Sequence, residues 1–163
     1  MIEAVIFDLD GTLINSEPNY YLADKAFIES FGVEFTKEMH ENFIGMGGVN
    51  LIKWLKNQMT IAQSIEDLCF IKDQYYLKYA RKQTKVFPEM KKLLELLKQN
   101  EIPMAIATGS TLNILSEMVE ITGIRDYFQH IVSSQEVAKG KPAPDVFLET
   151  AKRLSVNPQN CLV

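Results

Sequence analysis

Residues 4–13 read AVIFDLDGTL, and this stretch decides the fold that we predict. Residues 2–7 are short, rich in β-branched side chains and almost wholly apolar, a pattern typical of a strand buried on both faces of a parallel sheet. The predicted strand ends at two acids, Asp8 and Asp10, which Gly11 follows. Ligands of open parallel sheets bind beyond the carboxyl ends of the strands, so these carboxylates indicate either a functional site or a plain polar turn.

Strand and helix signals alternate in the second half of the chain. We predict strands at residues 102–107 and 127–132, and an apolar stub follows at residues 161–163. The spacing of apolar residues predicts helices between them, at residues 88–98, 111–122 and 144–154. Such alternation is typical of βαβ units. The sequence therefore predicts an α/β fold with a doubly wound, Rossmann-like parallel sheet covered by helices on both faces.

The segment between these two parts has a different pattern. Residues 16–84 contain helix signals and short loops only, with helices predicted at residues 17–31, 37–43, 50–59 and 64–82. We therefore predict a discontinuous core of residues 1–15 and 85–163, with an all-helical domain of residues 16–84 inserted after the first strand. The predicted hinges are residues 13–16 and 84–87.

Composition excludes several classes of partner. The 163 residues carry a net charge of −4 with no block of like charge, so we expect no nucleic acid and no membrane as partner. Cys69 and Cys161 lie far apart, which gives a disulfide framework or a zinc site little support. The apolar run near the N-terminus is too short for a signal peptide, so we expect a cytoplasmic protein. We also expect a monomer or weak dimer. His40 and His130 are expected at the surface or at helix ends.

Polar side chains follow each predicted strand. Thr108, Gly109 and Ser110 come directly after the second strand, and Lys141 lies in the loop beyond the third. Each group also has a simpler interpretation, a loop turn for Thr-Gly-Ser and a solvated lysine for Lys141. A calcium loop is disfavoured at the first strand, because its glycine would have to stand two positions later. If the fold is correct, these groups converge on the two acids.

Three stretches resemble motifs of one family. FDLDGTLINSEP (residues 7–18), AIATGS (105–110) and GKPAPDVF (140–147) are similar to the first three motifs of the haloacid dehalogenase superfamily. The helical insertion resembles the cap of the subgroup that includes β-phosphoglucomutase and phosphoglycolate phosphatase. Relatives continue beyond a strand like residues 161–163 into an acidic pair, whereas this chain stops at Val163. We therefore expect a core shortened at its C-terminal end.

The resemblance implies roles for the two acids and the lysine. Asp8 would be the nucleophile that takes up a phosphoryl group, and Asp10 would be the general acid and base. Lys141 would offset negative charge on Asp8 and the phosphate. Two acids suit this chemistry, because a carboxylate nucleophile divides the displacement into two steps and one acid/base group serves both.

The resemblance also implies ligand-binding groups. The Thr108 hydroxyl, with the backbone N–H groups of Gly109 and Ser110, would bind the phosphoryl oxygens. Mg²⁺ would be held by the Asp8 carboxylate and the Asp10 backbone carbonyl, together with an acid later in the chain. The cation would relieve repulsion between Asp8 and a phosphate dianion.

The leading hypothesis is magnesium-dependent hydrolysis of a small phosphorylated metabolite, such as a sugar phosphate, through an aspartyl-phosphate. A phosphosugar mutase is the first alternative, although β-phosphoglucomutases usually carry an Arg in the loop that here spans residues 43–48. They also carry a His near the start of the first cap helix, where this chain has residues 19–21, Asn-Tyr-Tyr. A second alternative is a non-catalytic remnant or interaction module, favoured by the missing acidic pair.

Overall fold

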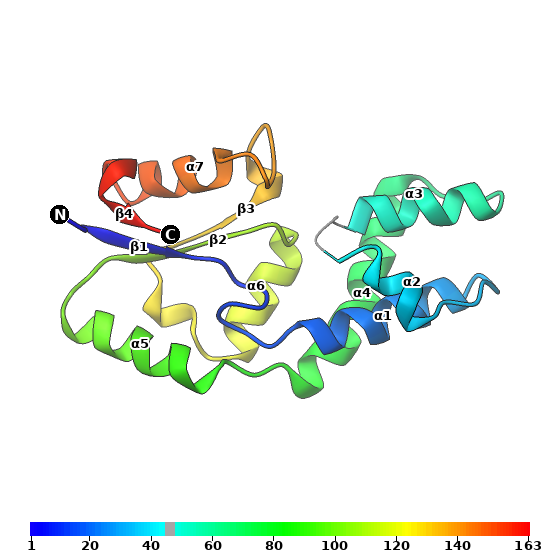
Figure 1. Cartoon of the computed structure of the whole chain (residues 1–163), viewed down its shortest axis with the longest axis horizontal. Helices are drawn as coiled ribbons and strands as arrows, with labels where there is room; N and C mark the ends of the chain where they lie inside the picture. The colour runs from blue at the N-terminus through cyan, green and yellow to red at the C-terminus, as the bar shows by residue number, and fades with distance from the viewer. Residues whose placement is uncertain (45–47) are drawn as a thin grey trace. The chain divides into compact units, whose positions relative to one another are not determined.

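The computed structural model describes residues 1–44 and 48–163, which form two compact units. One unit comprises Met1–Ser16 and Thr84–Val163, and the other comprises Glu17–Gln83. The first contains the sheet and the second is built from helices (Figure 1).

A four-stranded parallel sheet forms the centre of the first unit. Its strands lie in the order β3-β2-β1-β4, and every neighbouring pair is parallel. The strands are β1 (Ala4–Phe7), β2 (Met104–Thr108), β3 (His130–Ser133) and β4 (Cys161–Leu162). All residues of β1 and β2 are buried, as expected for central strands covered on both faces.

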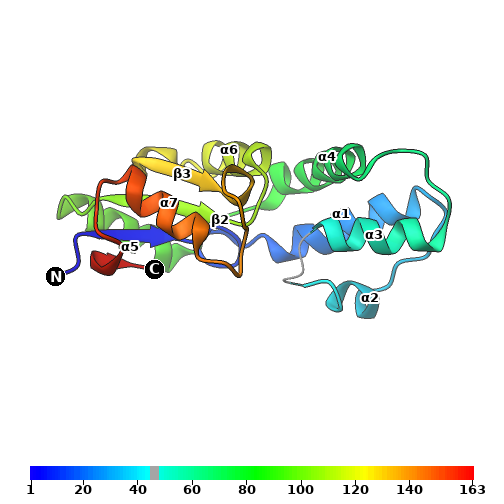
Figure 2. The same cartoon turned by 90° about the horizontal axis from the view of Figure 1, so that it is seen from above.

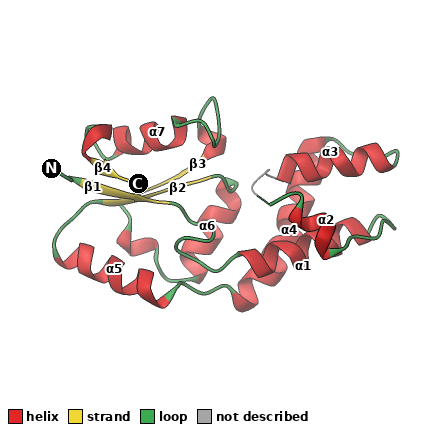
Figure 3. Cartoon of the chain, in the orientation of Figure 1, coloured by secondary structure: helices red, strands yellow, loops and turns green. Residues whose placement is uncertain are grey.

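Helices cover both faces of this sheet. Figure 3 shows α5 (Pro88–Gln99) and α6 (Leu112–Ile121) on one side and α7 (Asp145–Arg153) on the other. Figure 2, the view from above, shows α7 lying over the strands. Val146 and Ala151 of α7 are buried in a cluster with Ile6 of β1, because these apolar positions share the helix face that meets the sheet. The predicted α/β class with a doubly wound parallel sheet is confirmed.

The described part of the second unit is helical. Its helices are α1 (Glu17–Glu29), α2 (Lys37–Glu41), α3 (Gly48–Gln58) and α4 (Ile65–Gln83). Their shared core includes Phe27, Phe35 and Leu55, each fully buried. The loop compared with that of β-phosphoglucomutases, residues 43–48, lies partly outside the described residues, which omit residues 45–47.

Two strands begin later in the chain than predicted. The third strand begins at His130, because residues 125–127 form a short 3-10 turn in which the Tyr127 N–H bonds the Ile124 carbonyl at 3.1 Å. The second begins at Met104, because the Ile102 N–H bonds the Leu97 carbonyl at 3.0 Å and so belongs to the end of α5. Apolar runs cannot distinguish a strand from such adjoining turns.

One of the two histidines lies at a helix end, as expected. His40 lies near the end of α2 as predicted, but only 6% of it is exposed. Its two ring nitrogens each lie 3.3 Å from a carboxylate oxygen, one of Asp24 and one of Glu17. His130 lies on β3, paired with Ala105, and not at a helix end. Among the described residues, no helix combines the length and the apolar character that crossing a membrane requires.

Candidate active site

Asp8 follows β1 directly and forms an ion pair with Lys141. The Lys141 Nζ lies 2.8 Å from the Asp8 Oδ1 and donates a hydrogen bond to the Ala107 carbonyl at 3.0 Å. The same Asp8 oxygen accepts the Leu9 N–H at 2.8 Å. The Asp8 side chain remains 39% exposed. The acid is therefore held in place on one side and accessible to a solute on another.

A tight turn after Asp8 presents the second acid. Gly11 has φ of +71°, a conformation that L-residues with a side chain rarely adopt, and its N–H bonds the Ile14 carbonyl at 3.0 Å. Leu9, between the two acids, is fully buried. The Asp10 Oδ2 accepts a hydrogen bond from the Ser110 hydroxyl at 2.5 Å. The turn therefore aims Asp10 at the loop that follows β2.

Thr108 is the last residue of β2, and Gly109 and Ser110 begin that loop. Only 1% of Thr108 is exposed, and its hydroxyl oxygen accepts the Ser110 N–H at 3.1 Å. Because a hydroxyl also carries a donor, Thr108 can still donate a hydrogen bond. Gly109 is exposed, and an added Cβ would meet no atom within 4 Å. Thr111 caps α6, since its hydroxyl oxygen accepts the Ile114 N–H at 3.4 Å.

Two contacts link singled-out residues that are far apart in the sequence. One is the Asp8–Lys141 pair, and the other is the hydrogen bond from Ser110 to Asp10. Thr108 lies at the carboxyl end of β2, two residues before Ser110. The Ser110 N–H, expected to face a phosphate, bonds Thr108 in this structure. The catalytic and binding roles of these residues stay predictions.

The sequence reasoning missed the turn that follows β3. Ser133, Ser134 and Gln135 each bind a backbone group of residues 108–112, and Ser133 and Glu136 form a capping box. The available signal was the pattern Ser133-Ser-Gln-Glu136, since a serine followed three residues later by a glutamate is typical of such a box.

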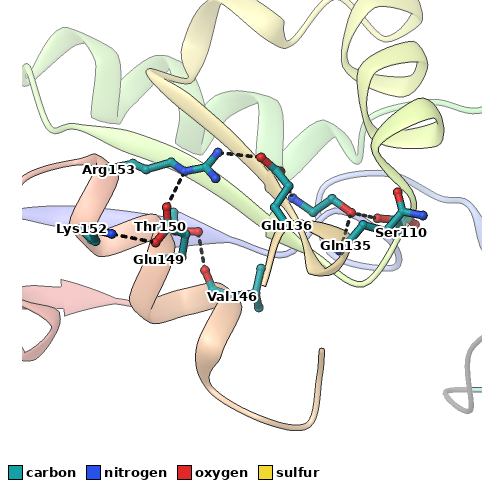
Figure 4. A network of polar contacts seen from close by, with 9 residues as sticks. Ser110, Gln135, Glu136, Val146, Glu149, Thr150, Lys152 and Arg153 are labelled. Atoms are coloured by element: carbon teal, nitrogen blue, oxygen red, sulfur yellow. Dashed lines mark hydrogen bonds and ion pairs between the residues drawn. The ribbon is translucent and has the colours of Figure 1, made fainter. Parts of the chain in front are cut away.

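An ionic network links this turn to α7. The Arg153 guanidinium bonds Glu136 at 2.9 Å and Glu149 at 3.0 Å (Figure 4). The hydrogen bond to Glu149, and to a smaller extent that to Glu136, raises the pKa of Arg153. The same bond to Arg153 lowers the pKa of Glu149. Because all three side chains are 25% to 30% exposed, each ion pair contributes modestly to stability.

Fold and site together define a doubly wound α/β protein with paired carboxylates and a lysine at the carboxyl ends of its strands. Residues 5–163 match the family described as haloacid dehalogenase-like hydrolase, and the chain belongs to that family. The resemblance stated from the motifs is therefore confirmed, and with it the expectation of a hydrolase.

Three similar proteins illustrate the range of the family. A phosphorylated carbohydrates phosphatase of Thermotoga maritima is 29% identical over 162 residues, covering 99% of this chain and 75% of its own length. A β-phosphoglucomutase of Bacillus subtilis is 30% identical, covering 98% of this chain and 73% of its own length. The structure of CbbY from Rhodobacter sphaeroides with xylulose 1,5-bisphosphate has a TM-score of 0.88 at 23% identity, covering 99% of this chain and 76% of that one. This last likeness supports the fold alone.

Proposed function

We propose that the chain hydrolyses a small phosphomonoester, of which a sugar phosphate is the leading candidate, through a phosphoenzyme on Asp8. The observation that carries the proposal is the accessible Asp8 carboxylate, which lies 2.8 Å from the Lys141 ammonium and is separated from Asp10 by one residue. The relative named for phosphorylated carbohydrates supports the choice of substrate class.

The reaction divides into two displacements. An Asp8 carboxylate oxygen attacks phosphorus, the bond to the ester oxygen breaks, and Asp10 protonates the leaving alcohol. Asp10, now a carboxylate, then removes a proton from water, whose oxygen attacks the aspartyl-phosphate and releases inorganic phosphate. Lys141 offsets negative charge on Asp8, and the Thr108 hydroxyl donates to a phosphoryl oxygen.

The residues present fit a hard cation by their donor type. The Asp8 carboxylate and the Asp10 backbone carbonyl are oxygen ligands of the kind that Mg²⁺ prefers, and they would hold it. When bound, Mg²⁺ would neutralise charge between the Asp8 carboxylate and the phosphate. Among the described residues, no three acidic, histidine or cysteine side chains lie together where they could hold a metal.

Phosphate release from a panel of sugar phosphates, with Mg²⁺ and with a chelator, tests the proposal. Asp8→Asn should lower turnover by about 10⁴-fold or more, because the nucleophile is lost. Asp126→Asn is the matched control, since Asp126 is an exposed acid in the 3-10 turn at residues 125–127. Equal activity in wild type and Asp8→Asn would overturn the role of Asp8.

A phosphosugar mutase is the second candidate, favoured by the similarity to the Bacillus subtilis β-phosphoglucomutase. A mutase would convert a sugar phosphate to its isomer with little net release of phosphate. Following the sugar phosphate and inorganic phosphate in the same reaction by ³¹P NMR separates the two activities. If no ester yields either inorganic phosphate or an isomerised sugar phosphate, the result would favour the non-catalytic interaction module.

A further inference from the structure

The last residue of β3 and the turn after it bind the loop that carries Ser110. Three successive side chains there bind three different backbone groups of residues 108–112. The Ser133 hydroxyl donates to the Ser110 carbonyl at 2.6 Å, and the Ser134 hydroxyl donates to the Thr108 carbonyl at 3.0 Å. The Gln135 side-chain oxygen accepts the Leu112 N–H at 2.9 Å. The conformation of the loop is thus fixed from outside.

Ser133 is the most enclosed of these residues. It is fully buried, and it pairs with Thr108 in the register of β2 and β3. Its hydroxyl donates to Ser110 and accepts the Gln135 N–H at 3.2 Å, while its own N–H is bound by Glu136 at 2.8 Å. A buried side chain with its donor and acceptor both engaged holds one orientation.

Ser110 connects Ser133 to Asp10, the proposed acid/base group. Its carbonyl is held by Ser133, and its hydroxyl donates to the Asp10 Oδ2 at 2.5 Å. We propose that Ser133 is a positioning residue for the reaction, acting through Ser110 to fix the Asp10 carboxylate. The inference rests on the proposed function, since Asp10 matters only if it transfers protons. Small misplacements of such a group lower the rate of the chemical step.

A pair of serine variants isolates this path. Ser133→Ala removes the bond to Ser110. Ser134→Ala removes a bond of the same kind to Thr108, a residue outside the proposed path from Ser133 through Ser110 to Asp10. For Ser133→Ala we expect kcat to fall by about tenfold with KM changed less than about twofold. For Ser134→Ala we expect kcat to fall by less than about threefold. Equal losses in both variants would overturn the path.

A double-mutant cycle with Ser110→Ala gives the sharper test. If Ser133 acts through Ser110, the double variant is no slower than Ser110→Ala alone, because the path is already broken. Multiplied losses would show that the two serines act independently and would overturn the proposal. Ser133→Thr, which keeps the hydroxyl, should retain most of the activity, and thermal unfolding of every variant checks that the fold is intact.

A measurement without substrate separates this inference from the proposed function. Ser133→Ala should speed amide hydrogen exchange at residues 110–112 by about tenfold, and Ser134→Ala should leave it within about threefold. Unchanged exchange in Ser133→Ala would overturn the positioning role even in an active enzyme. Faster exchange in a chain that releases no phosphate would keep the loop-ordering contact, while the proposed function and its positioning role would fail.

Discussion

Each unit of the molecule contains a lysine–aspartate ion pair, and the two pairs differ in burial far more than in length. Lys141 lies 2.8 Å from Asp8, with 26% and 39% of the side chains exposed. Lys72 lies 2.9 Å from Asp24, with 8% and 7% exposed. Distance therefore does not separate the pair proposed for chemistry from a structural one, whereas accessibility does.

The surroundings of the buried pair explain its role. Asp24 lies on α1 and Lys72 on α4, and the His40 ring of α2 approaches Asp24 to 3.3 Å. The Lys72 ammonium also lies 5.5 Å from the centre of the Tyr20 ring. Together the Asp24, His40 and Lys72 side chains connect α1, α2 and α4 within the helical unit. A buried charge of this kind is costly once its partner is removed.

The largest expected effect on activity in this comparison concerns Lys141. Lys141→Met should lower kcat by about 10²- to 10³-fold, because the charge beside Asp8 is lost. Thermal stability should change little, since this pair is accessible to solvent. Phosphate release and a thermal melt measure the two effects. Lys139→Met is the control, an exposed lysine two residues away, and we expect it to match wild type. A similar loss of kcat in both variants would show that the loss of any positive charge, and not the contact with Asp8, lowers the activity.

The buried pair should show the opposite behaviour. Lys72→Met should lower the free energy of unfolding by about 3 kcal/mol, because it leaves the Asp24 charge buried without its partner. The double variant Lys72→Met, Asp24→Leu should recover much of that loss, since no uncompensated charge remains. Urea unfolding measures both values. If the double variant is as unstable as the single one, packing of the Lys72 stem outweighs the charge.

The turn beside the exposed pair gives a smaller effect. Gly11→Ala should destabilise the fold by about 1 kcal/mol, because an alanine is strained at φ of +71°. Gly109→Ala is a matched control for stability: at neither position would a Cβ meet an atom within 4 Å, and Gly109 is not among the positive-φ residues. Urea unfolding gives the free energy of unfolding of both variants, and their difference reports the backbone strain at Gly11. Equal loss in both would remove the argument from backbone conformation.

The exposed pair could be anticipated from the sequence, and the buried one could not. Asp8 and Lys141 stand in strand-end motifs, whose place in a parallel sheet follows from βαβ alternation. Asp24, His40 and Lys72 lie on helices where apolar periodicity marks only the buried face, and it does not show which polar residues share that face. The Ser133 contacts were missed for a related reason, since they depend on register between β2 and β3.

The Glu149–Arg153 pair, with 27% and 30% of the side chains exposed, is as accessible as the Lys141–Asp8 pair and should give the smallest effect. The hydrogen bond from Arg153 lowers the pKa of Glu149 below the ordinary value of 4.5. A lowered pKa contributes stability that is present above pH 4.5 and is lost as the pH falls through the lowered value. Wild type should therefore melt slightly above Glu149→Gln at neutral pH, and the difference should vanish with acidification. Glu95→Gln, on the exposed face of α5, is the control for a general change of charge. A difference that persists to about pH 2.5 would show that Glu149 stabilises α7 by packing and not by its charge.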